Sequence, residues 1–344
     1  MTVTARRLAV VLATVALAAP AACASVDVPE SLPGPTTSTT EAPASTGPPP
    51  DCGNPVASLR PSGPATGTVA GGSYMAEIQE RGRLRVGVDV ATFQLSSVDP
   101  LTGRFQGFDV DIANEVAIAL FGDASPEHIE FVGIPSSERI PALTDGAVRV
   151  DMVASAFTVN CARREDIAFS TEYFHAGQRV LVRTDDAVLA GSDDGGESPA
   201  ADPVEALQRI GERDGTVCVS AGSTAIGNIE GLGLADPPAI EPAPQRADCL
   251  VRLQQGQTDA LVTDDAILAG MAAQDPSLGL VTDGDTLSDE PYGLGLPPDR
   301  PEWVRYVNAV LEDVRESGRW DALYAEWLEP LLGPQQAPAA VYED

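Results

Sequence analysis

Short apolar runs alternate with helical patterns along most of this chain, and this alternation restricts the possible folds more than any other feature. The first run, Leu84–Val88, is rich in β-forming residues. Asp109 and Asp111 suit a helix N-terminus, and the apolar residues around them recur at helical spacing. Further strands are predicted over Ile129–Gly133, Val150–Ala154 and Val180–Val182, with a short helix at Ile140–Leu143.

The same rhythm returns in a second block, after a Gly/Ser/Asp-rich loop over Ser192–Asp202. A strand is predicted at Thr216–Val219, followed by a turn at Ser220–Ser223 and a helix from Thr224. The next predicted elements are a short strand from Ile240, a helix at Leu250–Gln255, a strand at Ala260–Thr263 and a helix at Asp264–Ala272. An apolar helical stripe (Trp303, Val307, Val310, Leu311, Val314) and a helix at Trp320–Leu328 close the chain. Two such blocks predict two α/β lobes, with a ligand bound between them at the carboxyl ends of strands.

The N-terminus has the three parts of a secretory signal peptide. Residues 1–7 are cationic, Leu8–Ala22 is almost wholly apolar, and the small pair Ala21-Ala22 precedes Cys23. The cysteine resembles that of a lipobox, where it is acylated and becomes the new N-terminus, although Pro20 stands where an aliphatic residue is preferred. We expect residues 1–22 to be a signal peptide and Cys23 to anchor the protein at the extracytoplasmic face of the membrane. Cleavage followed by secretion is the alternative.

Residues 23–72 are rich in Pro, Ser, Thr and Gly, for example over Pro33–Thr40 and Thr46–Pro50. Such a segment buries too little apolar surface to offset the loss of chain entropy. We therefore expect a flexible tether between the lipid anchor and the folded part.

Charge and composition exclude several classes of function. Asp and Glu number 51 against 21 Lys and Arg, for a net charge of −30, which repels nucleic acid. The chain has no lysine, so a phosphate-binding loop with its lysine, a Schiff base and a pyridoxal site are impossible. Only His128 and His175 offer an imidazole base. No cofactor is expected, and catalysis would have few groups to use.

Four cysteines follow Cys23, and an exported protein is expected to pair them. Three pairings are possible. We favour Cys52 with Cys161, which would attach the end of the tether to the first lobe, and Cys218 with Cys249, both in the second lobe. A metal site is disfavoured because the spacings are irregular and no histidine lies near the cysteines in sequence.

Several segments closely resemble blocks of the family 3 bacterial extracellular solute-binding proteins, which serve polar amino-acid ABC transporters. The most specific is residues 107–120 (GFDVDIANEVAIAL). Residues 151–170 (DMVASAFTVNCARREDIAFS), 256–270 (GQTDALVTDDAILAG), 290–297 (EPYGLGLP) and 318–328 (GRWDALYAEWL) resemble further blocks. The resemblance covers most of Leu84–Leu328.

The resemblance implies a two-lobed periplasmic-binding-protein type II fold with two hinge crossovers. Lobe 1 would comprise residues 73–172 and 293–344, lobe 2 residues 178–286, and the hinges residues 173–177 and 287–292. It further implies a monomer that closes around a free polar amino acid and delivers it to a membrane ABC permease. A sensor that presents its ligand state to a membrane receptor would use the same closure, and the sequence does not separate the two.

The resemblance also places residues around the ligand. Arg163 matches the motif arginine that binds the α-carboxylate, and a guanidinium suits that group because it donates two parallel hydrogen bonds. Thr158 and Ala156 lie in the same loop. Asp264 matches the aspartate that pairs with the α-ammonium, and Asp265 beside it is expected to be a helix cap or a solvated charge. Ser223 and Thr224 lie at a helix N-terminus, whose free N–H groups suit a carboxylate.

Selectivity for the ligand side chain is predicted from a smaller set of residues. Ser136 and Arg139 resemble the pair that contacts a side-chain carboxylate in glutamate/aspartate binders. Asp89, at the end of the first strand, would repel such a carboxylate unless a donor intervenes. Phe93 and Phe157 are candidate walls, although either residue also suits a core. Glutamate or aspartate is favoured, followed by asparagine and glutamine.

An enzyme on the same scaffold is the main alternative from a different class, because some two-lobed periplasmic proteins resemble dehydratases. Such an enzyme needs an acid/base pair in the cleft. His175, near a predicted hinge, is the one candidate base, and an ordinary polar hinge residue explains it better. We therefore expect a binding protein that is not an enzyme.

Overall fold

The structure, a computed structural model, describes residues 51–63, 65, 69–190 and 199–343. The predicted signal peptide, Cys23, the tether up to residue 50 and most of the predicted loop Ser192–Asp202 lie outside these residues. Within the described ranges, no helix combines the length and the apolar character needed to cross a bilayer.

Lobe 1 is built on a five-stranded sheet. Its strand order is β5-β1-β6-β14-β7, in which β1 runs parallel to β5 and β6 while β14 runs antiparallel to β6 and β7. The strands are β1 (Leu84–Val88), β5 (Ile129–Gly133), β6 (Met152–Val153), β7 (Ala168–Phe169) and β14 (Gly295–Leu296). A small sheet of β2 (Ala91–Thr92), β3 (Ser96–Val98) and β4 (Phe105–Gln106) follows β1.

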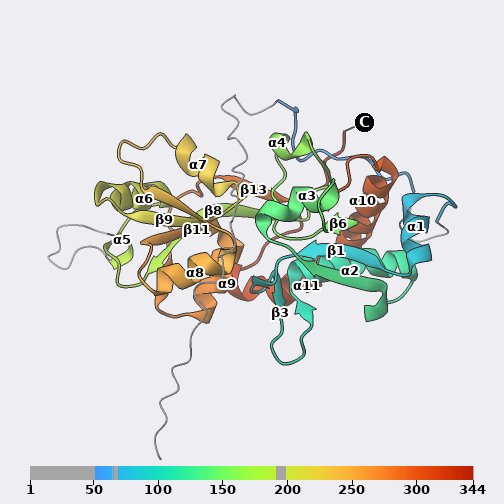
Figure 1. The fold of residues 1–344 in the computed structure, drawn as a ribbon, viewed down its shortest axis with the longest axis horizontal. Coiled ribbons are helices and arrows are strands. Elements are labelled where there is room, and N and C mark those ends of the chain that lie inside the picture. Colours follow the sequence, from blue (N-terminus) through green and yellow to red (C-terminus); the bar gives the residue numbers. More distant parts are fainter. Residues whose placement is uncertain (1–50, 64, 66–68, 191–198, 344) are drawn as a thin grey trace, which may run out of the picture. The chain divides into compact units, whose positions relative to one another are not determined.

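Helices from both ends of the folded chain belong to lobe 1 (Figure 1). They are α1 (Tyr74–Arg81), α2 (Phe108–Phe121), α3 (Arg139–Leu143), α4 (Cys161–Arg164), α10 (Pro301–Glu316), α11 (Arg319–Trp327) and α12 (Glu329–Leu332), with the 3-10 turns η1 (Pro126–His128) and η2 (Ser136–Glu138). The predicted stripe of α10 is confirmed, because Trp303, Val307, Val310, Leu311 and Val314 are all buried in the core. This packing brings the end of the chain back onto the lobe that the chain forms first.

Lobe 2 is built on a second sheet with the order β10-β9-β11-β8-β12 (Figure 1). Its strands are β8 (Phe174–Arg183), β9 (Thr216–Ser220), β10 (Ala239–Ala243), β11 (Ala260–Asp264) and β12 (Leu278–Leu280). Its helices are α5 (Ala187–Ala190), α6 (Pro203–Glu212), α7 (Ala225–Gly231), α8 (Arg246–Gln254) and α9 (Asp265–Gln274). Strands β9, β10 and β11 are parallel, whereas β8 and β12 are antiparallel to their neighbours.

Two chain segments connect the lobes side by side. The start of β8 pairs antiparallel with β13 (Asp289–Tyr292), from Asp289 opposite Gly177 to Tyr292 opposite Phe174. The chain enters lobe 2 along β8 and returns along β13 to β14 in the first sheet. The carboxyl ends of β1, β9 and β11 carry Asp89, the turn after Ser220, and Asp264, so polar residues of both lobes gather where these strands end.

Several predicted element boundaries differ from the observed ones. The strand predicted at Val180–Val182 is part of the longer β8 (Phe174–Arg183). Of the predicted strand Val150–Ala154, only Met152–Val153 pairs as a strand, although all five residues are buried. Helix α8 begins at Arg246 rather than Leu250, because Gln245 and Asp248 form a reciprocal capping box at its start. The sequence does not reveal this cap because Gln is an uncommon N-cap residue.

The end of the predicted tether is attached to lobe 1, and the predicted pairing of Cys52 with Cys161 is confirmed. Flexibility is predicted for residues 23–72, but residues 52–59 lie against lobe 1, with Ala57 6% and Ser58 3% exposed. A disulfide between Cys52 and Cys161 and several hydrogen bonds hold this segment. Covalent and polar contacts thus replace the apolar burial that its composition cannot supply.

Candidate ligand-binding site

Two arginine side chains of lobe 1 lie buried beside one aromatic ring. Arg139 is the first residue of α3 and is 2% exposed, and Arg163 in α4 is 8% exposed. Their guanidinium carbons lie 4.4 and 4.9 Å from the centre of the Phe157 ring. Cation–π attraction favours this arrangement, so Phe157 forms a wall shared by both cations.

The hydrogen-bond donors of both arginines go to backbone carbonyl oxygens. Arg139 donates to Ser136 and Ser155 at 3.0 Å and to Ala156 at 2.9 Å. Arg163 donates to Thr158 at 2.6 Å. Each also donates at 3.3 Å to the carbonyl oxygen of Gly222, which belongs to lobe 2.

Neither guanidinium forms an ion pair with a carboxylate among the residues that the structure describes. Burial, followed by repulsion from the Arg163 charge, lowers the pKa of Arg139 well below its ordinary value. Burial likewise lowers the pKa of Arg163 to about 10. A bound anion would favour the charged forms, so this pair of cations is suited to a ligand carboxylate.

The loop that carries Phe157 is held in an uncommon backbone conformation. Ala156 has a φ of 44°, in the left-handed region that residues other than glycine seldom adopt. Its amide donates to Asp109 Oδ2 at 2.8 Å, and the Tyr173 hydroxyl donates to Asp109 Oδ1 at 2.7 Å. Burial raises the pKa of Asp109 to about 6. Asp109, in the first turn of α2, thus holds the loop that carries Ala156 and Phe157 by accepting from its backbone.

Asp264 offers a buried carboxylate at the end of β11. It is 5% exposed and accepts one hydrogen bond, at 2.6 Å, from the hydroxyl of Tyr292 in β13. Burial, followed by the charge of Glu290, raises the pKa of Asp264 to about 7. Its neighbour Asp265 accepts from the amides of Ala266 at 2.7 Å and Gly177 at 3.3 Å, so it serves the backbone. Asp264 is the carboxylate suited to a ligand ammonium.

Asp89 forms an ion pair that joins the two lobes. Arg246, the first residue of α8 in lobe 2, lies 3.1 Å from Asp89, and each side chain is 5% exposed. Arg246 also donates to Thr92 Oγ1 at 3.2 Å and to the Ser155 carbonyl at 3.4 Å, both in lobe 1. The sequence predicts that Asp89 repels a ligand carboxylate unless a donor intervenes, and Arg246 is a donor in that place.

Glu290 of β13 makes a second polar connection between the lobes. It is 1% exposed and accepts from the hydroxyls of Thr158 in lobe 1 and of Thr224 in lobe 2, the latter at 2.9 Å. Asn228 and Ser288 donate to its other oxygen at 3.0 and 2.7 Å. Thr158 and Thr224, both predicted to contact a ligand, therefore donate their hydroxyl protons to Glu290.

Four buried hydroxyl groups around these side chains make no hydrogen bond within the described part of the chain. They belong to Ser136, Ser155, Ser220 and Ser223. Buried polar groups are rarely left without a partner, because each one loses its hydration. Ser136 and Ser223 are among the predicted ligand contacts, and these groups add neutral donors to the charged ones.

The structure brings most of the predicted site residues together. Asp89, Ser136, Arg139, Ala156, Phe157, Thr158, Arg163 and Asp264 are buried in one region, with Ser223 and Thr224 at the start of α7. Phe93 is only half-buried. Its carbonyl lies so near Gly270 of α9 that a Cβ there would come within 2.7 Å.

Sequence reasoning missed Arg246 and Glu290. A cation in the first turn of a helix interacts unfavourably with the helix dipole. The position of Arg246 therefore indicates that its side chain contacts a group outside α8. Glu290 lies in residues 290–297, which carry part of the family resemblance, and in the predicted hinge at residues 287–292. Its neighbours in sequence do not indicate that its side chain is buried.

In the described ranges, no group of three or more His, Cys, Asp or Glu side chains is arranged to hold a metal ion. The assembled site instead contains guanidiniums, carboxylates and hydroxyls from two lobes. The charges and hydrogen-bond donors of such a set are suited to a small zwitterion or an anion.

The two sheet-containing lobes have the type II fold of periplasmic binding proteins, a class that binds solutes between its lobes. Residues 84–330 match the model of the bacterial extracellular solute-binding proteins, family 3, and the chain belongs to this family.

Named relatives and a solved structure agree with this assignment. The chain is 29% identical over 255 residues to the ABC transporter glutamine-binding protein GlnH of Bacillus subtilis, covering 74% of this chain and 84% of that protein. It is 28% identical over 268 residues to the glutamate-binding protein GluB of Corynebacterium glutamicum, covering 76% and 84%. The crystal structure of the ancestral amino acid-binding protein AncCDT-1, a precursor of cyclohexadienyl dehydratase, matches with a TM-score of 0.61 and 30% identity, over 74% of this chain and 99% of that one.

Proposed function

We propose that this protein captures a free acidic amino acid, glutamate or aspartate, by closing its two lobes around it, and delivers it to an ABC permease. The observation that carries the proposal is the pair of buried guanidiniums, Arg139 and Arg163. Within the described residues they donate only to carbonyl oxygens, and they lie in the same region as the buried carboxylate of Asp264. Asparagine and glutamine are the next ligands in order, since they keep the α-carboxylate and the α-ammonium.

The charges of such a ligand match those of the site. Arg163 would take the α-carboxylate, and Asp264 the α-ammonium. Arg139, together with the Ser136 hydroxyl, would take the side-chain carboxylate. Charge-assisted hydrogen bonds of this kind contribute about 1.5–3 kcal/mol each, so a second carboxylate gains appreciably over an amide. The Ser223 hydroxyl at the start of α7 would supply a further donor from lobe 2.

Closure would use the two connections between the lobes as hinges, at Tyr173–Gly177 and Leu287–Tyr292. Lobe 1 would then comprise residues 73–172 and 293–344, and lobe 2 residues 178–286. The cross-lobe contacts of Gly222, Arg246 and Glu290 belong to the closed state. A ligand favours that state only through its higher affinity for it, so residues that contact the ligand from both lobes drive closure.

Delivery to a permease is supported by the family and by the relative named as part of an ABC transporter. We place the protein at the extracytoplasmic face of the membrane, anchored through a lipid on Cys23 after removal of residues 1–22. A receptor that reads the closed state would use the same lobes. Uptake of labelled ligand by cells lacking this protein separates transport from sensing. Deletion lowers uptake if the protein is a transport component and leaves it unchanged if the protein is a sensor.

An enzymatic role is the weaker proposal, even though AncCDT-1 is named as a precursor of a dehydratase. His175, the one candidate base, has a side chain that is 52% exposed, and it pairs with Glu172 at 2.7 Å and with Asp289 at 3.5 Å. These partners explain the residue without a substrate.

Calorimetric titration of the purified protein with the twenty amino acids tests the proposal. Saturable binding of glutamate or aspartate, with weaker binding of their amides, is the expected result. Tighter binding of glutamine than of glutamate would show that Asp89 rather than Arg139 sets the selectivity. Absence of binding by any amino acid, in folded protein stripped of carried-over ligand, would contradict the proposed function.

A further inference from the structure

Residues 52–59, called here the N-terminal strap, are fixed along lobe 1 by contacts at both ends. At one end, Cys52 is bonded to Cys161. At the other end, the Ser58 hydroxyl donates to the Phe169 carbonyl of β7 at 2.7 Å, and Asn308 of α10 donates to Ser58 Oγ at 2.9 Å. The Ser58 amide donates to Val341 at 3.0 Å, so the C-terminal segment holds the strap as well.

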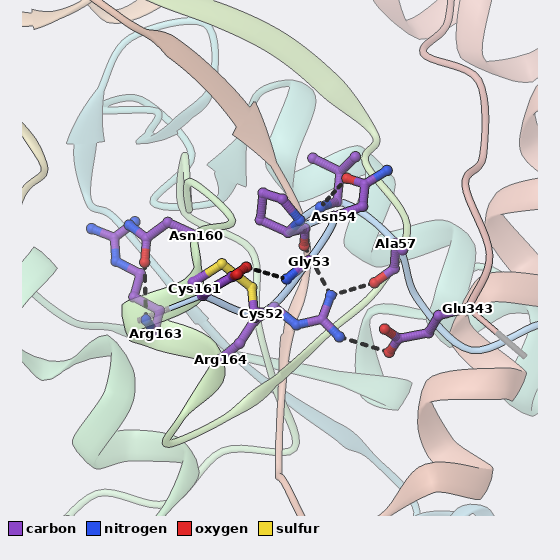
Figure 2. The surroundings of a disulfide bond; sticks show 12 residues. Cys52, Gly53, Asn54, Ala57, Asn160, Cys161, Arg163, Arg164 and Glu343 are labelled. Atoms are coloured by element: carbon purple, nitrogen blue, oxygen red, sulfur yellow. Dashed lines mark hydrogen bonds and ion pairs between the residues drawn. A yellow bond between two sulfur atoms is a disulfide. The ribbon is translucent and has the colours of Figure 1, made fainter. Parts of the chain in front are cut away.

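The contacts at the Cys52 end fall on α4, the helix that carries Arg163 (Figure 2). Cys161 is the first residue of α4. Arg164, its last residue, donates to the carbonyl of Pro55 at 2.9 Å and to that of Ala57, and it pairs with Glu343 at 2.6 Å. The strap is therefore attached to both ends of α4, covalently at one and through an arginine at the other.

Arg163 and Arg164 leave α4 in different directions. Figure 2 shows the Arg164 side chain reaching toward Ala57 and Glu343, while the Arg163 side chain points away from them. The Arg163 guanidinium instead contacts Thr158, Gly222 and the Phe157 ring. One residue of α4 thus faces the strap and the preceding residue faces the proposed ligand site.

A helix of this length cannot hold its own position. Four residues form a single turn, and a first turn fixes many dihedral angles for few hydrogen bonds, so it is unstable alone. Asn160 caps α4 by accepting from the Arg163 amide at 2.9 Å, but this contact is local and moves with the turn. The position of α4 relative to β7 and α10 therefore depends on tertiary contacts such as those of the strap.

We propose that the N-terminal strap positions Arg163 for ligand binding, with Arg164 as the positioning residue and the Cys52–Cys161 disulfide as the covalent support. The inference rests on the proposed function, in which Arg163 binds the α-carboxylate. A bidentate arginine contact tolerates displacements of only about half an ångström. A shift of α4 therefore weakens binding even when the fold is intact.

The test compares Arg164→Gln with Arg305→Gln in the otherwise unchanged protein. Arg305 of α10 also contacts the N-terminal segment, by donating to the Arg60 carbonyl. Within the described residues, no hydrogen bond or ion pair joins it to α4. Titration with L-glutamate is expected to show about tenfold weaker binding for Arg164→Gln, as loss of part of one charge-assisted hydrogen bond requires, and unchanged binding for Arg305→Gln. Arg164→Lys, which keeps the charge beside Glu343, is expected to restore part of the affinity.

The two disulfides provide a second, independent comparison. Replacing Cys52 and Cys161 together by serine is expected to weaken glutamate binding. Replacing Cys218 and Cys249 together by alanine removes a cross-link from lobe 2 and is expected to leave the affinity unchanged. This contrast separates positioning from stability, because a role in stability alone does not alter the affinity of the folded protein.

Faster amide hydrogen exchange at residues 161–165 in Arg164→Gln, but not in Arg305→Gln, would support the proposal directly. Wild-type affinity in both Arg164→Gln and the Cys52/Cys161 variant would overturn it while leaving the proposed function intact. A wild-type protein that binds no amino acid would overturn the proposed function, and this inference with it.

Discussion

Arg139, Arg163 and Asp264 are charged side chains placed where water is scarce. Burial raises the free energy of each charged form, and the directions of their pKa shifts reflect this: the arginines shift down and the aspartate shifts up. Such groups destabilise the free protein and are compensated when a ligand of opposite charge binds. In the proposed function, ligand binding and stability of the free protein therefore make opposite demands on these positions.

Asp264→Asn is expected to abolish amino-acid binding and to stabilise the free protein at pH 8. The folded-state pKa of Asp264 is raised to about 7, above its ordinary value of 3.8. At pH values below 3.8 Asp264 is protonated in both the folded and the unfolded chain, and its burial is least costly. As pH rises through about 7 the buried carboxyl ionises, and this contribution to the free energy of unfolding is lost. The asparagine variant should thus have a higher melting temperature than wild type at pH 8, and the gap should narrow toward pH 5.

Thermal unfolding over this pH range, together with titration by glutamate, checks the prediction. Ligand binding by the wild type should weaken as pH falls below about 7, since the protonated carboxyl no longer attracts the ammonium. An asparagine variant that is less stable than wild type at pH 8 would contradict the assigned role of burial at Asp264.

The ion pair of Arg246 with Asp89 is predicted to act on closure. Removing one partner of a buried pair costs about 3–5 kcal/mol because the other charge stays buried. Since the pair spans the lobes, this cost falls on the closed state, and Arg246→Gln is expected to weaken glutamate binding more than 100-fold. Adding Asp89→Asn should recover part of the loss.

Arg252→Gln is the matched control in the same helix. Arg252 pairs with Glu241 at 3.7 Å, and both side chains are partly exposed, so its loss is expected to change the affinity little. Equal affinities for the Arg246 and Arg252 variants would mean that the cross-lobe pair contributes nothing to binding.

The turn between β9 and α7 brings the backbone of lobe 2 close to the backbone of lobe 1 in the site. Gly222 has a φ of 76°, and a Cβ at this position would lie 2.7 Å from Ser137 Cα. Only glycine accepts both the left-handed backbone and the contact. Its carbonyl oxygen thereby reaches Arg139 and Arg163 together.

Gly222→Ala is therefore expected to weaken glutamate binding about 10- to 100-fold, because steric overlap of this kind costs about 1–3 kcal/mol. Gly227→Ala is the control, since a Cβ at Gly227 in α7 meets nothing within 4 Å. That variant should bind normally and gain about 0.5–1 kcal/mol in the free energy of unfolding. Calorimetry and urea unfolding measure the two quantities, and normal binding by Gly222→Ala would rule out the closed contact as the bound state.

The two lobes have separate sheets, and a covalent cross-link stabilises each of them at a different place. Cys218 in β9 and Cys249 in α8 are fully buried, and their disulfide closes a sequence separation of 31 residues within lobe 2. The Cys52–Cys161 disulfide joins the N-terminal strap to lobe 1 across 109 residues. Neither bond crosses between the lobes, so neither opposes an opening motion.

Replacing Cys218 and Cys249 together by alanine is expected to lower the free energy of unfolding by about 3–4 kcal/mol, as loop closure of this length predicts. Circular dichroism during urea unfolding measures the loss. An unchanged midpoint would show that the core of lobe 2 is held by packing alone.

Most secondary-structure elements and several candidate site residues of this protein can be predicted from its sequence. Local periodicity determines the elements, and polar residues mark their ends. The strand at Leu84–Val88 and the apolar stripe of α10 match their predictions, and Asp89 and Asp264 stand at strand ends as expected. The motif predicts Arg163 as a ligand contact, and the resemblance to a known pair predicts Arg139. These residues could be predicted because the signal for each of them lies in its neighbours in sequence.

The remaining features depend on packing between distant segments. Arg246 meets Asp89 across 157 positions, and Glu290 meets Thr158 across 132. The strap reaches α4 across a similar distance, and its cysteine predicts the link to Cys161. Nothing in its sequence predicts the contacts of Ser58 with β7 or of Arg164 with Pro55. Local patterns set the strands, helices and charged ends of this chain. Only the tertiary structure decides which of those charges face each other, because that depends on how the two lobes and the strap pack.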